Sequence, residues 1–444
     1  MKILLIQPKM NKRPMDTELK TRMSPPLGLY TLLSLTPEGH EVRVVNENIE
    51  KIPFNYPADL VGITVTLDVF PSACDISAKF RSRGVHVVAG GIHITCSAEE
   101  CLPHFDAICV GPAERVWAKM IEDAESGELN KIYQDTQGFK GEEIASPKYD
   151  SIDRKKYLYT NVLTTSRGCP CRCDFCYNSC ANRFYVRRPV DDVLRDIVAL
   201  HTRHIYFVDD NFIGNPAYTR TLVEAIKGMG LKWNAAVTTK ILNHLDLLDL
   251  MVESGCQSLF IGFESVNNAA LAAVHKDNSA ELYGRLAEEL HKRGIMINAS
   301  MVFGLDGDGC ETFKNTLEWL VKNKIETLTA HILTPYPGTK LHERMEAAGR
   351  ITDGNLSHYN TAHVVFEPKG ISKKALYKGY LRIYRQFYSL KNIWRRRPKN
   401  AKQRKAYFMF NLMYRKFGWF SSAICKLVPM SIIGRIGEWI SYRV

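Results

Sequence analysis

Residues 165–178 read TSRGCPCRCDFCYN, and Cys169, Cys173 and Cys176 in this stretch have the spacing C-x3-C-x2-C. The stretch follows a strand-like run, so the three cysteines fall on a loop at the carboxyl end of a strand. A [4Fe–4S] cluster needs four ligands, which are usually cysteine thiolates. Three thiolates from one loop leave one iron open to a ligand from outside the protein. The spacing therefore predicts a [4Fe–4S] cluster with one free coordination position.

The same cysteines admit a second interpretation, a structural zinc site, because Cys171 and Cys180 are available as further ligands. Zinc sites of this kind normally take four ligands from two separate knuckles. An aromatic residue, Phe175, lies between the last two cysteines of the motif and would cover one face of a cofactor. This aromatic, the spacing and the strand–loop–helix context together favour the iron–sulfur cluster.

Outward from this loop, residues 158–345 alternate strand-like and helix-like runs, which predicts a partial or complete β/α barrel of the TIM type. Such barrels build their sites at the carboxyl ends of the strands. The strands are predicted at residues 162–165, 204–208, 232–237, 258–263, 296–303 and 326–333, with helices that include 190–201, 218–229 and 280–293.

Residues 1–125 also alternate short apolar runs with helical stretches, which predicts a doubly wound parallel sheet. Ligands bind such sheets at the carboxyl ends of the strands. The segment 126–157 is polar and weakly patterned, and we expect it to be a linker. The strands are predicted at residues 2–7, 40–47, 59–65, 85–90 and 105–110, a helix at 71–82, and the ligand loops at 64–69, 90–95 and 111–114.

The composition is that of a folded protein, since 45% of the 444 residues are hydrophobic and 24% are charged. The first residues, MKILLIQP, are followed at once by lysines and do not resemble a signal peptide. No apolar run approaches the roughly 18 residues of a membrane span, so we expect a cytoplasmic protein. Thiols stay reduced in that compartment, so the 12 cysteines are not expected to form a disulfide framework.

The net charge of +12 is unevenly distributed along the chain. Residues 346–444 are predicted to be helical, basic and aromatic, and from residue 368 onward they hold 19 Lys and Arg against the single acid Glu438. A basic helical segment with Trp and Phe suits the interface of an anionic membrane, here through residues 391–440. A structural cap and an RNA-binding surface are the alternatives, and nucleic acid is the least favoured of the three.

The cysteine motif resembles that of the radical S-adenosylmethionine (SAM) superfamily. The resemblance implies that the amine and carboxylate of SAM bind the open iron and that one electron cleaves the sulfonium to a 5′-deoxyadenosyl radical. It also implies a flavodoxin- or ferredoxin-like electron donor. Cys171, inside the motif, departs from the pattern and would compete with Cys169; we expect its side chain to point away from the cluster.

Four predicted strand ends carry segments that resemble the SAM-binding positions of this superfamily. The segment FVDDNF at 207–212 would accept the SAM ammonium, GFES at 262–265 would hold the ribose, SMVFG at 300–304 would lie near the adenine, and LTPYPG at 333–338 resembles the same subfamilies. The alternative for each acid is a solvated or helix-capping carboxylate. The residues implied are Phe175, Asp209, Asp210, Asn211, Glu264, Ser300, Val302 and Leu333.

The order of segments in residues 1–125 resembles the cobalamin-binding domain that precedes the barrel in one subfamily. The Asp-x-His-x-x-Gly signature of some cobalamin proteins is absent. The resemblance therefore implies either cobalamin held without a protein imidazole or a scaffold without cobalamin. A lone histidine in such a loop is more often a polar loop residue than a ligand. The residues implied in cobalamin binding are Thr64, Val65, Gly90, Gly91, His93, Gly111 and Glu114.

Domain order and resemblance together predict a cobalamin-dependent enzyme that C-methylates an unactivated carbon of a small, lipid-soluble or natural-product substrate. The first alternative keeps the radical but not the methyl transfer, and would rearrange, cyclise or couple a lipid or tetrapyrrole. RNA methylthiolation resembles this chain only in the barrel. A non-catalytic iron–sulfur or lipid-binding protein is the alternative from a different class.

Overall fold

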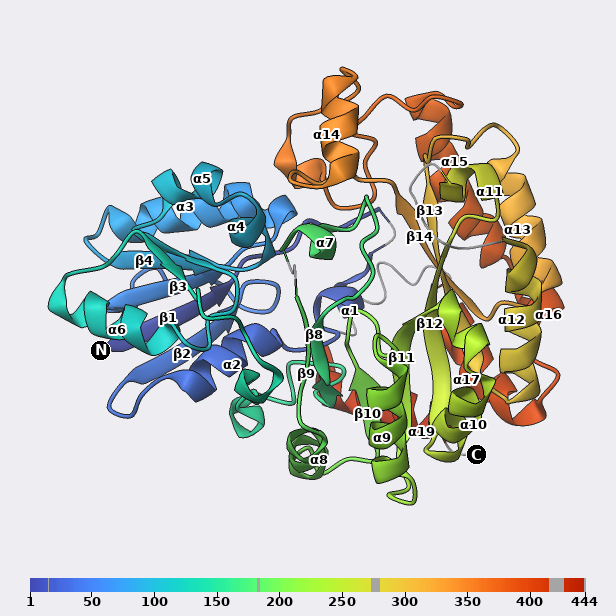
Figure 1. Ribbon diagram of the computed structural model, residues 1–444, viewed down its shortest axis with the longest axis horizontal. Helices are drawn as coiled ribbons and strands as arrows, with labels where there is room; N and C mark the ends of the chain where they lie inside the picture. Colours follow the sequence, from blue (N-terminus) through green and yellow to red (C-terminus); the bar gives the residue numbers. More distant parts are fainter. Residues whose placement is uncertain (15, 182–183, 273–279, 415–426, 443–444) are drawn as a thin grey trace.

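The computed structural model describes the chain except for residues 15, 182–183, 273–279, 415–426 and 443–444. Two α/β units lie side by side, and the C-terminal helices pack on the second of them (Figure 1). The α/β fold class predicted from the sequence is confirmed, because both units are built on parallel sheets.

The first unit is a six-stranded parallel sheet with the order β2-β1-β3-β4-β5-β6. Its central strands are apolar along their length because helices cover both faces. Helix α3 packs on one face through Ile76 and Phe80, and α2 and α6 cover the other through Leu29 and Trp117. The strands are β1 Lys2–Gln7, β2 Glu41–Asn46, β3 Leu60–Thr64, β4 His86–Gly90, β5 Ala107–Val110 and β6 Ile132–Gln134, and the helices are α1 Glu18–Thr21, α2 Leu27–Leu35, α3 Phe70–Arg81, α4 Ile92–Cys96, α5 Ala98–Cys101 and α6 Trp117–Ser126.

The predicted linker, residues 126–157, contributes the edge strand β6 to this sheet. In this three-residue strand only Tyr133 is buried. Its hydroxyl donates to Asp123 at 2.7 Å, which ties the strand back to α6. The first sheet therefore extends beyond residue 125, the predicted end of the domain. The sequence could not reveal this strand, because three residues are too few to show an alternating pattern.

The second unit is a partial barrel with the strand order β14-β13-β12-β11-β10-β7, in which every adjacent pair is parallel. Burial alternates along β11, so one face packs on helices while the other faces the barrel interior. All six predicted strands are present within one or two residues. They are β7 Val162–Leu163, β10 His204–Phe207, β11 Lys232–Thr238, β12 Cys256–Glu264, β13 Met296–Phe303 and β14 Thr327–Ile332, and the helices are α8 Val190–Ala199, α9 Pro216–Ile226, α10 Leu245–Glu253, α11 Asn268–Ala272, α12 Ala280–Lys292, α13 Thr312–Lys322 and α14 Lys340–Ala347.

A short antiparallel hairpin, β8 Ser166–Gly168 with β9 Tyr185–Arg187, lies between the first barrel strand and α8. The cysteine loop and helix α7, Tyr177–Ala181, connect its two strands. The pairing closes the base of this loop, and the Arg188 amide bonds the Thr165 carbonyl at 2.9 Å just beyond it. The cysteines are therefore held at the carboxyl end of β7.

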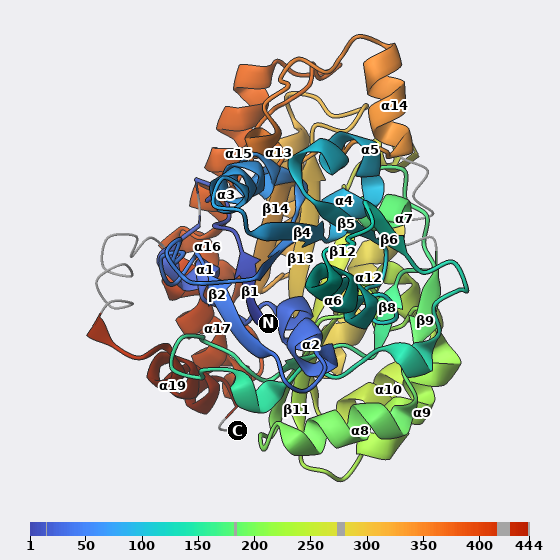
Figure 2. The ribbon, with the colours of Figure 1, turned by 90° about the vertical axis from the view of Figure 1, so that its left-hand side faces the viewer.

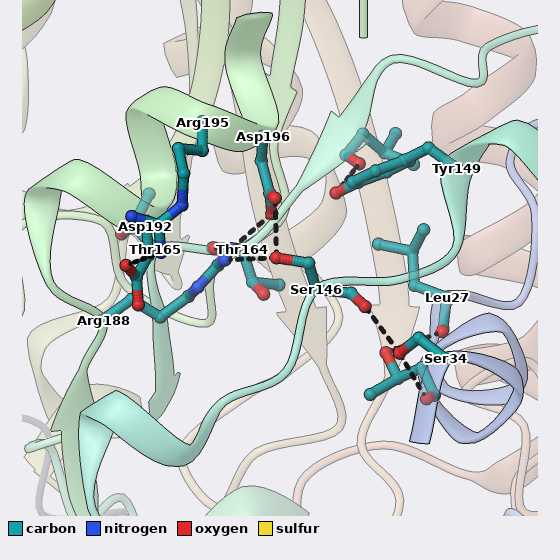
Figure 3. A network of polar contacts seen from close by, with 12 residues as sticks. Leu27, Ser34, Ser146, Tyr149, Thr164, Thr165, Arg188, Asp192, Arg195 and Asp196 are labelled. Atoms are coloured by element: carbon teal, nitrogen blue, oxygen red, sulfur yellow. Dashed lines mark hydrogen bonds and ion pairs between the residues drawn. The ribbon is translucent and has the colours of Figure 1, made fainter. Parts of the chain in front are cut away.

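A polar network, buried at Arg188 and Asp196, joins the two units near Ser146 (Figure 3). The Ser34 hydroxyl of α2 donates to the Ser146 carbonyl at 2.7 Å, and the Ser146 hydroxyl donates to Asp196 of α8 at 2.6 Å. The Arg188 guanidinium donates to the same Asp196 at 2.7 Å and to the Ser146 hydroxyl at 2.9 Å. These contacts fix the first sheet relative to the barrel.

The C-terminal region is helical, as predicted, and part of it is a structural cap on the barrel. The Arg396 side chain is fully buried, stacks on Phe387 at 3.4 Å and donates to the carbonyls of Ile325 and Glu326. None of the described helices is both long and apolar enough to cross a bilayer. The helices are α15 Lys373–Phe387, α16 Leu390–Arg396, α17 Ala401–Tyr414 and α19 Met430–Tyr442.

Candidate functional site

The cysteine loop presents partly buried thiols between the hairpin and α7. The Cys176 amide bonds the Cys173 carbonyl at 3.0 Å, so the last two predicted ligands share one turn that leads into the helix. The Cys171 thiol shares a hydrogen bond with the Cys169 thiol. The Cys171 thiol therefore lies beside the Cys169 thiol, contrary to the expectation that it points away.

The donor set of this loop consists of thiols, which are the usual ligands of an iron–sulfur cluster. Among the described residues, no three or more His, Cys, Asp and Glu side chains are arranged to hold one metal ion. In a [4Fe–4S] cluster each cysteine binds a different iron, so its ligands stand apart around a larger group.

Two of the predicted SAM-binding acids lie near the third cysteine. Burial raises the pKa of the Cys176 thiol, and the nearby carboxylates of Asp210 and Glu264 raise it further. Asp210 also accepts a hydrogen bond of 2.6 Å from the Asn178 side chain of α7. The ends of β10 and β12 therefore meet the cysteine loop, as expected of the strand ends of a barrel.

Asp209 has a structural role that the sequence did not indicate. Its buried carboxylate accepts hydrogen bonds from the backbone amides and the hydroxyls of Thr165 and Ser166, at 2.5–3.2 Å. Burial raises its pKa to about 6, although these donors lower it. The carboxylate thus ties β10 to the start of the hairpin, mainly through Oδ1, while Oδ2 receives only the 3.2 Å contact from the Thr165 amide and keeps accepting capacity for an ammonium group.

Asn211, two residues further on, offers a second acceptor for that group. Its side chain is buried, and its Oδ1 accepts no hydrogen bond from any described residue. A buried carbonyl oxygen without a donor is costly, and a ligand ammonium would satisfy it.

Glu264 has a strained backbone at the end of β12. Its φ of +64° lies in the left-handed region, and the pairing of β12 with β13 shifts register between Gly262 and Glu264. Such strain in a non-glycine residue is concentrated at functional sites. The remaining predicted residues, Ser300, Val302 and Leu333, are buried at the ends of the next two strands, while Phe175 is partly buried and packs against the barrel core.

A cavity of about 350 Å³ lies at the carboxyl ends of β3, β4 and β5, between the sheet and helices α2 and α6. The structure brings together in its wall five of the seven residues predicted to bind cobalamin. Trp117 and Arg167 also line it, and the Arg167 guanidinium pairs with Glu114 at 2.6 Å. Because Arg167 belongs to β8, the hairpin of the cysteine loop closes this cavity. The five predicted residues are Thr64, Gly90, Gly91, Gly111 and Glu114.

Val65 and His93 are not in this wall. The Val65 side chain is buried in the core on the α3 face of the sheet. His93 lies in α4, fully buried, and its Nδ1 stands 2.9 Å from the Tyr177 hydroxyl of α7. Burial lowers the pKa of His93 to about 4, so the ring is neutral near pH 7. The helical turn after Gly91 directs this side chain towards the cysteine loop and not into the cavity.

A second cavity, of about 560 Å³, lies between the two units. It is lined by Asp68 after β3, Arg13 before α1, and Tyr177 and Tyr336 beside the cysteine loop. The ring centroids of these two tyrosines are 4.7 Å apart and their planes differ by 8°.

The sequence analysis did not predict that Tyr177, Arg13 and Arg167 line these cavities. Tyr177 and Arg167 could have been considered, because they lie within the cysteine stretch at residues 165–178.

The fold and the loop define an enzyme class in which a cofactor loop stands at the strand ends of a β/α barrel. Residues 163–320 match the family described as the radical SAM superfamily. The recognition made from the cysteine motif is therefore confirmed: the chain contains a radical SAM domain and is a radical SAM enzyme. Residues 339–418 match a domain of unknown function, DUF4070.

Three curated relatives resemble most of the chain. The bacteriochlorophyllide d C-12(1)-methyltransferase of Chlorobaculum tepidum is 28% identical over 89% of this chain and 89% of its own length. The hopanoid C-2 methylase of Rhodopseudomonas palustris is 26% identical over 74% and 65%. The anaerobic magnesium-protoporphyrin IX monomethyl ester cyclase of Rubrivivax gelatinosus is 25% identical over 88% and 75%.

Two solved structures share the fold over nearly the whole chain. The radical SAM methyltransferase TsrM from Kitasatospora setae, with cobalamin and a [4Fe–4S] cluster bound, gives a TM-score of 0.66 at 15% identity over 98% of this chain and 99% of that one. The cobalamin-dependent radical SAM enzyme OxsB gives 0.69 at 17% identity over 94% and 72%. The first unit therefore has the fold found beside the barrel in both.

Proposed function

We propose that this chain is a cobalamin-dependent radical SAM enzyme that C-methylates an unactivated carbon of a lipid-soluble or natural-product substrate. The observation that carries the proposal is the position of Arg167. This residue stands two positions before Cys169, lines the cavity of the first unit and pairs with Glu114 there. The cofactor cavity and the cysteine loop are therefore two parts of one site.

Within this site, Cys169, Cys173 and Cys176 would hold the [4Fe–4S] cluster. Asn211 would accept a hydrogen bond from the SAM ammonium, and Glu264 would hold the ribose hydroxyls. When bound, the cluster and SAM supply a primary carbon radical, and cobalamin supplies a methyl group. The protein must hold the target carbon close to that radical and exclude water, which the buried strand ends support.

The cavity of the first unit would hold the nucleotide of cobalamin. Gly90 and Gly111 at the strand ends leave room for a ligand to approach the backbone, while Gly91 packs closely against the Val65 backbone. The described residues that line the cavity include no histidine, which fits a cobalamin held without a protein imidazole. Trp117 and the aliphatic residues of α2 offer the apolar contacts that an aromatic base requires.

The substrate would enter the second cavity, between the two units. Tyr177 and Tyr336 line this cavity, so a substrate bound there would lie beside the cysteine loop. The methyltransferases among the relatives act on a bacteriochlorophyllide and a hopanoid, both largely apolar molecules. A tetrapyrrole or a polycyclic lipid is accordingly the substrate class that we propose.

The experiment is an anaerobic assay of the reconstituted protein with SAM, a reductant and candidate substrates of both classes. We expect bound cobalamin, formation of 5′-deoxyadenosine and a product heavier than the substrate by one CH2. Protein produced with excess cobalamin that retains none would overturn the methyl-transfer proposal.

A second function is favoured by one observation, the similarity to the anaerobic cyclase over 88% of the chain. In that case the radical would lead to ring formation or rearrangement without methyl transfer. The mass of the product separates the two functions, because only methylation adds a CH2.

The C-terminal helices would bring the enzyme to an anionic membrane surface. On α19 the side chains of Ile432, Ile436 and Trp439 are 46%, 53% and 55% exposed, at helical spacing. They stand beside the basic helix α17, which α19 contacts. In a sedimentation assay, the protein should pellet with anionic vesicles and stay in solution with neutral ones.

The reductant would be a flavodoxin- or ferredoxin-like protein.

A further inference from the structure

Two short helices from different units meet beside the cysteine loop. Helix α4 begins immediately after the glycines that end β4, and α7 begins immediately after Cys176. The two helices pack on each other, and α7 lies between the first sheet and the barrel (Figure 1), close to α4 in the second view as well (Figure 2). A movement of either helix would therefore change the position of Cys176, the third cysteine of the motif.

His93 of α4 makes the central polar contact of this junction. The side chain is fully buried, and its ring meets the Phe70 ring edge-on at 4.7 Å. Its Nδ1 is 2.9 Å from the Tyr177 hydroxyl, while its Nε2 has no hydrogen-bond partner among the described residues. The Glu100 carboxylate stands 3.9 Å from Nε2, beyond hydrogen-bond distance. Burying a polar ring nitrogen without a hydrogen bond is costly, so packing alone does not explain a histidine here.

Tyr177 is held from two further directions. Its ring stacks on Tyr336, which follows the last barrel strand, and its hydroxyl also forms a hydrogen bond with the thiol of Cys96. The Cys96 thiol also shares a hydrogen bond with the thiol of Cys180, which lies one turn further along α7. These contacts restrain the Tyr177 side chain from several sides. Because Tyr177 follows Cys176 at the start of α7, they also restrain the backbone that carries the Cys176 thiol.

We propose that His93 is a positioning residue for the iron–sulfur cluster, acting through the Tyr177 hydroxyl to fix the Cys176 thiolate. The inference rests on the proposed function only for the presence of the cluster, and not on cobalamin or methyl transfer. It gives His93 a role different from the cofactor cavity that its sequence position suggested. Contacts one residue away from a metal ligand set its orientation and tune the reduction potential.

The experiment compares His93→Phe, which removes the hydrogen bond, with His93→Gln, which keeps an amide in its place. Both are reconstituted anaerobically, and the cluster is followed by EPR during a redox titration with and without SAM. His86→Phe is the matched control, because His86 is an exposed residue at the opposite end of β4.

We expect His93→Phe to shift the midpoint potential and the SAM-bound EPR signal and to slow 5′-deoxyadenosine formation by roughly 10- to 100-fold. His93→Gln should recover most of this loss, and the control should match the unmodified protein. Tyr177→Phe should reproduce the His93→Phe spectrum, and the double variant should add nothing further, because the two residues act as one unit. Cobalamin content should stay the same in all of them.

Unchanged potential and spectrum in both His93→Phe and Tyr177→Phe would overturn the inference. Loss of cobalamin with an unchanged cluster would also overturn it and return His93 to the cofactor cavity. If His93→Phe does not fold, Tyr177→Phe decides alone. Failure of the unmodified protein to form any cluster would instead overturn the proposed function.

Discussion

The two sheets of this enzyme form their candidate ligand sites with different kinds of residues. Both are parallel, and both place a ligand site at the carboxyl ends of their strands. In the barrel the site is made of side chains with their own chemistry, such as Cys176, Asn211 and Glu264. In the first unit it is made partly of missing side chains: Gly90 and Gly111 leave space in the cavity, and Gly91 allows the turn to pack against the Val65 backbone. The sequence therefore points to one site through its reactive side chains and to the other through its glycines.

The largest effect is expected where the barrel supplies chemistry. Cys176→Ala should abolish 5′-deoxyadenosine formation, because a cluster with one ligand missing does not hold its iron. Cobalamin binding should remain close to that of the unmodified protein, since the cavity of the first unit contains no cysteine of the loop. Iron analysis, the activity assay and the visible spectrum measure the three properties. Retained activity would show that Cys171 or another thiol is the third ligand.

A smaller effect is expected at the strained end of β12. Glu264→Gln should weaken SAM binding by roughly 10- to 100-fold, because a hydrogen bond to a charged group contributes about 1.5–3 kcal/mol. Isothermal titration of the reconstituted protein with SAM measures this. Glu281→Gln, at an exposed position in the first turn of α12, is the matched control. Equal SAM affinity in both variants would remove Glu264 from the site.

The first unit should respond to added volume and not to lost chemistry. Gly90→Leu should weaken cobalamin binding by roughly tenfold, because the new side chain takes space in the cavity. Gly354→Leu is the control, since a side chain there meets no atom within 4 Å. Iron content and cluster spectrum should not change in either variant. Full cobalamin affinity in Gly90→Leu would place the cofactor elsewhere.

The smallest effect is expected on stability in acid. Burial lowers the pKa of His331 to about 4, and the charge of Arg13 adds to this. The unfolded chain, with a histidine pKa near 6.5, binds more protons between these values, so stability is lost as the pH falls through about 6.5 towards 4. On going from pH 7 to pH 5 this histidine should cost on the order of 2 kcal/mol of the free energy of unfolding, and His331→Gln should abolish that cost.

Urea unfolding at pH 7 and pH 5 measures this difference, with exposed His86→Gln as the control. An equal loss of stability on acidification in the His331 variant and the unmodified protein would contradict the assignment. The variant should bind cobalamin normally, because His331 belongs to β14 and not to the first sheet.

The regular elements could be predicted because burial leaves a periodic pattern. The predicted strand 296–303 matches β13, and the helix predicted at 280–293 matches α12 within one residue. The hairpin of β8 and β9 left no such pattern, because each strand has only three residues. The hairpin nevertheless matters, since it closes the cysteine loop against the cavity of the first unit.

Some contacts in the candidate site come from geometry that no local pattern reveals. Asp209 is predicted to accept the SAM ammonium, and its Oδ1 also accepts from four donors of Thr165 and Ser166, which are distant in sequence. His93 follows the glycines of the cavity by only two residues, yet one helical turn directs it to Tyr177. Spacing predicts which residues share a loop, but it does not predict which way each side chain points.

The central claim is one cluster with one iron left open for SAM. Mössbauer and EPR spectra of the anaerobically reconstituted protein, recorded before and after addition of SAM, test it most directly. We expect four irons per chain, one of which changes its spectrum when SAM is added. Zinc in place of iron, or a cluster whose spectra ignore SAM, would contradict it.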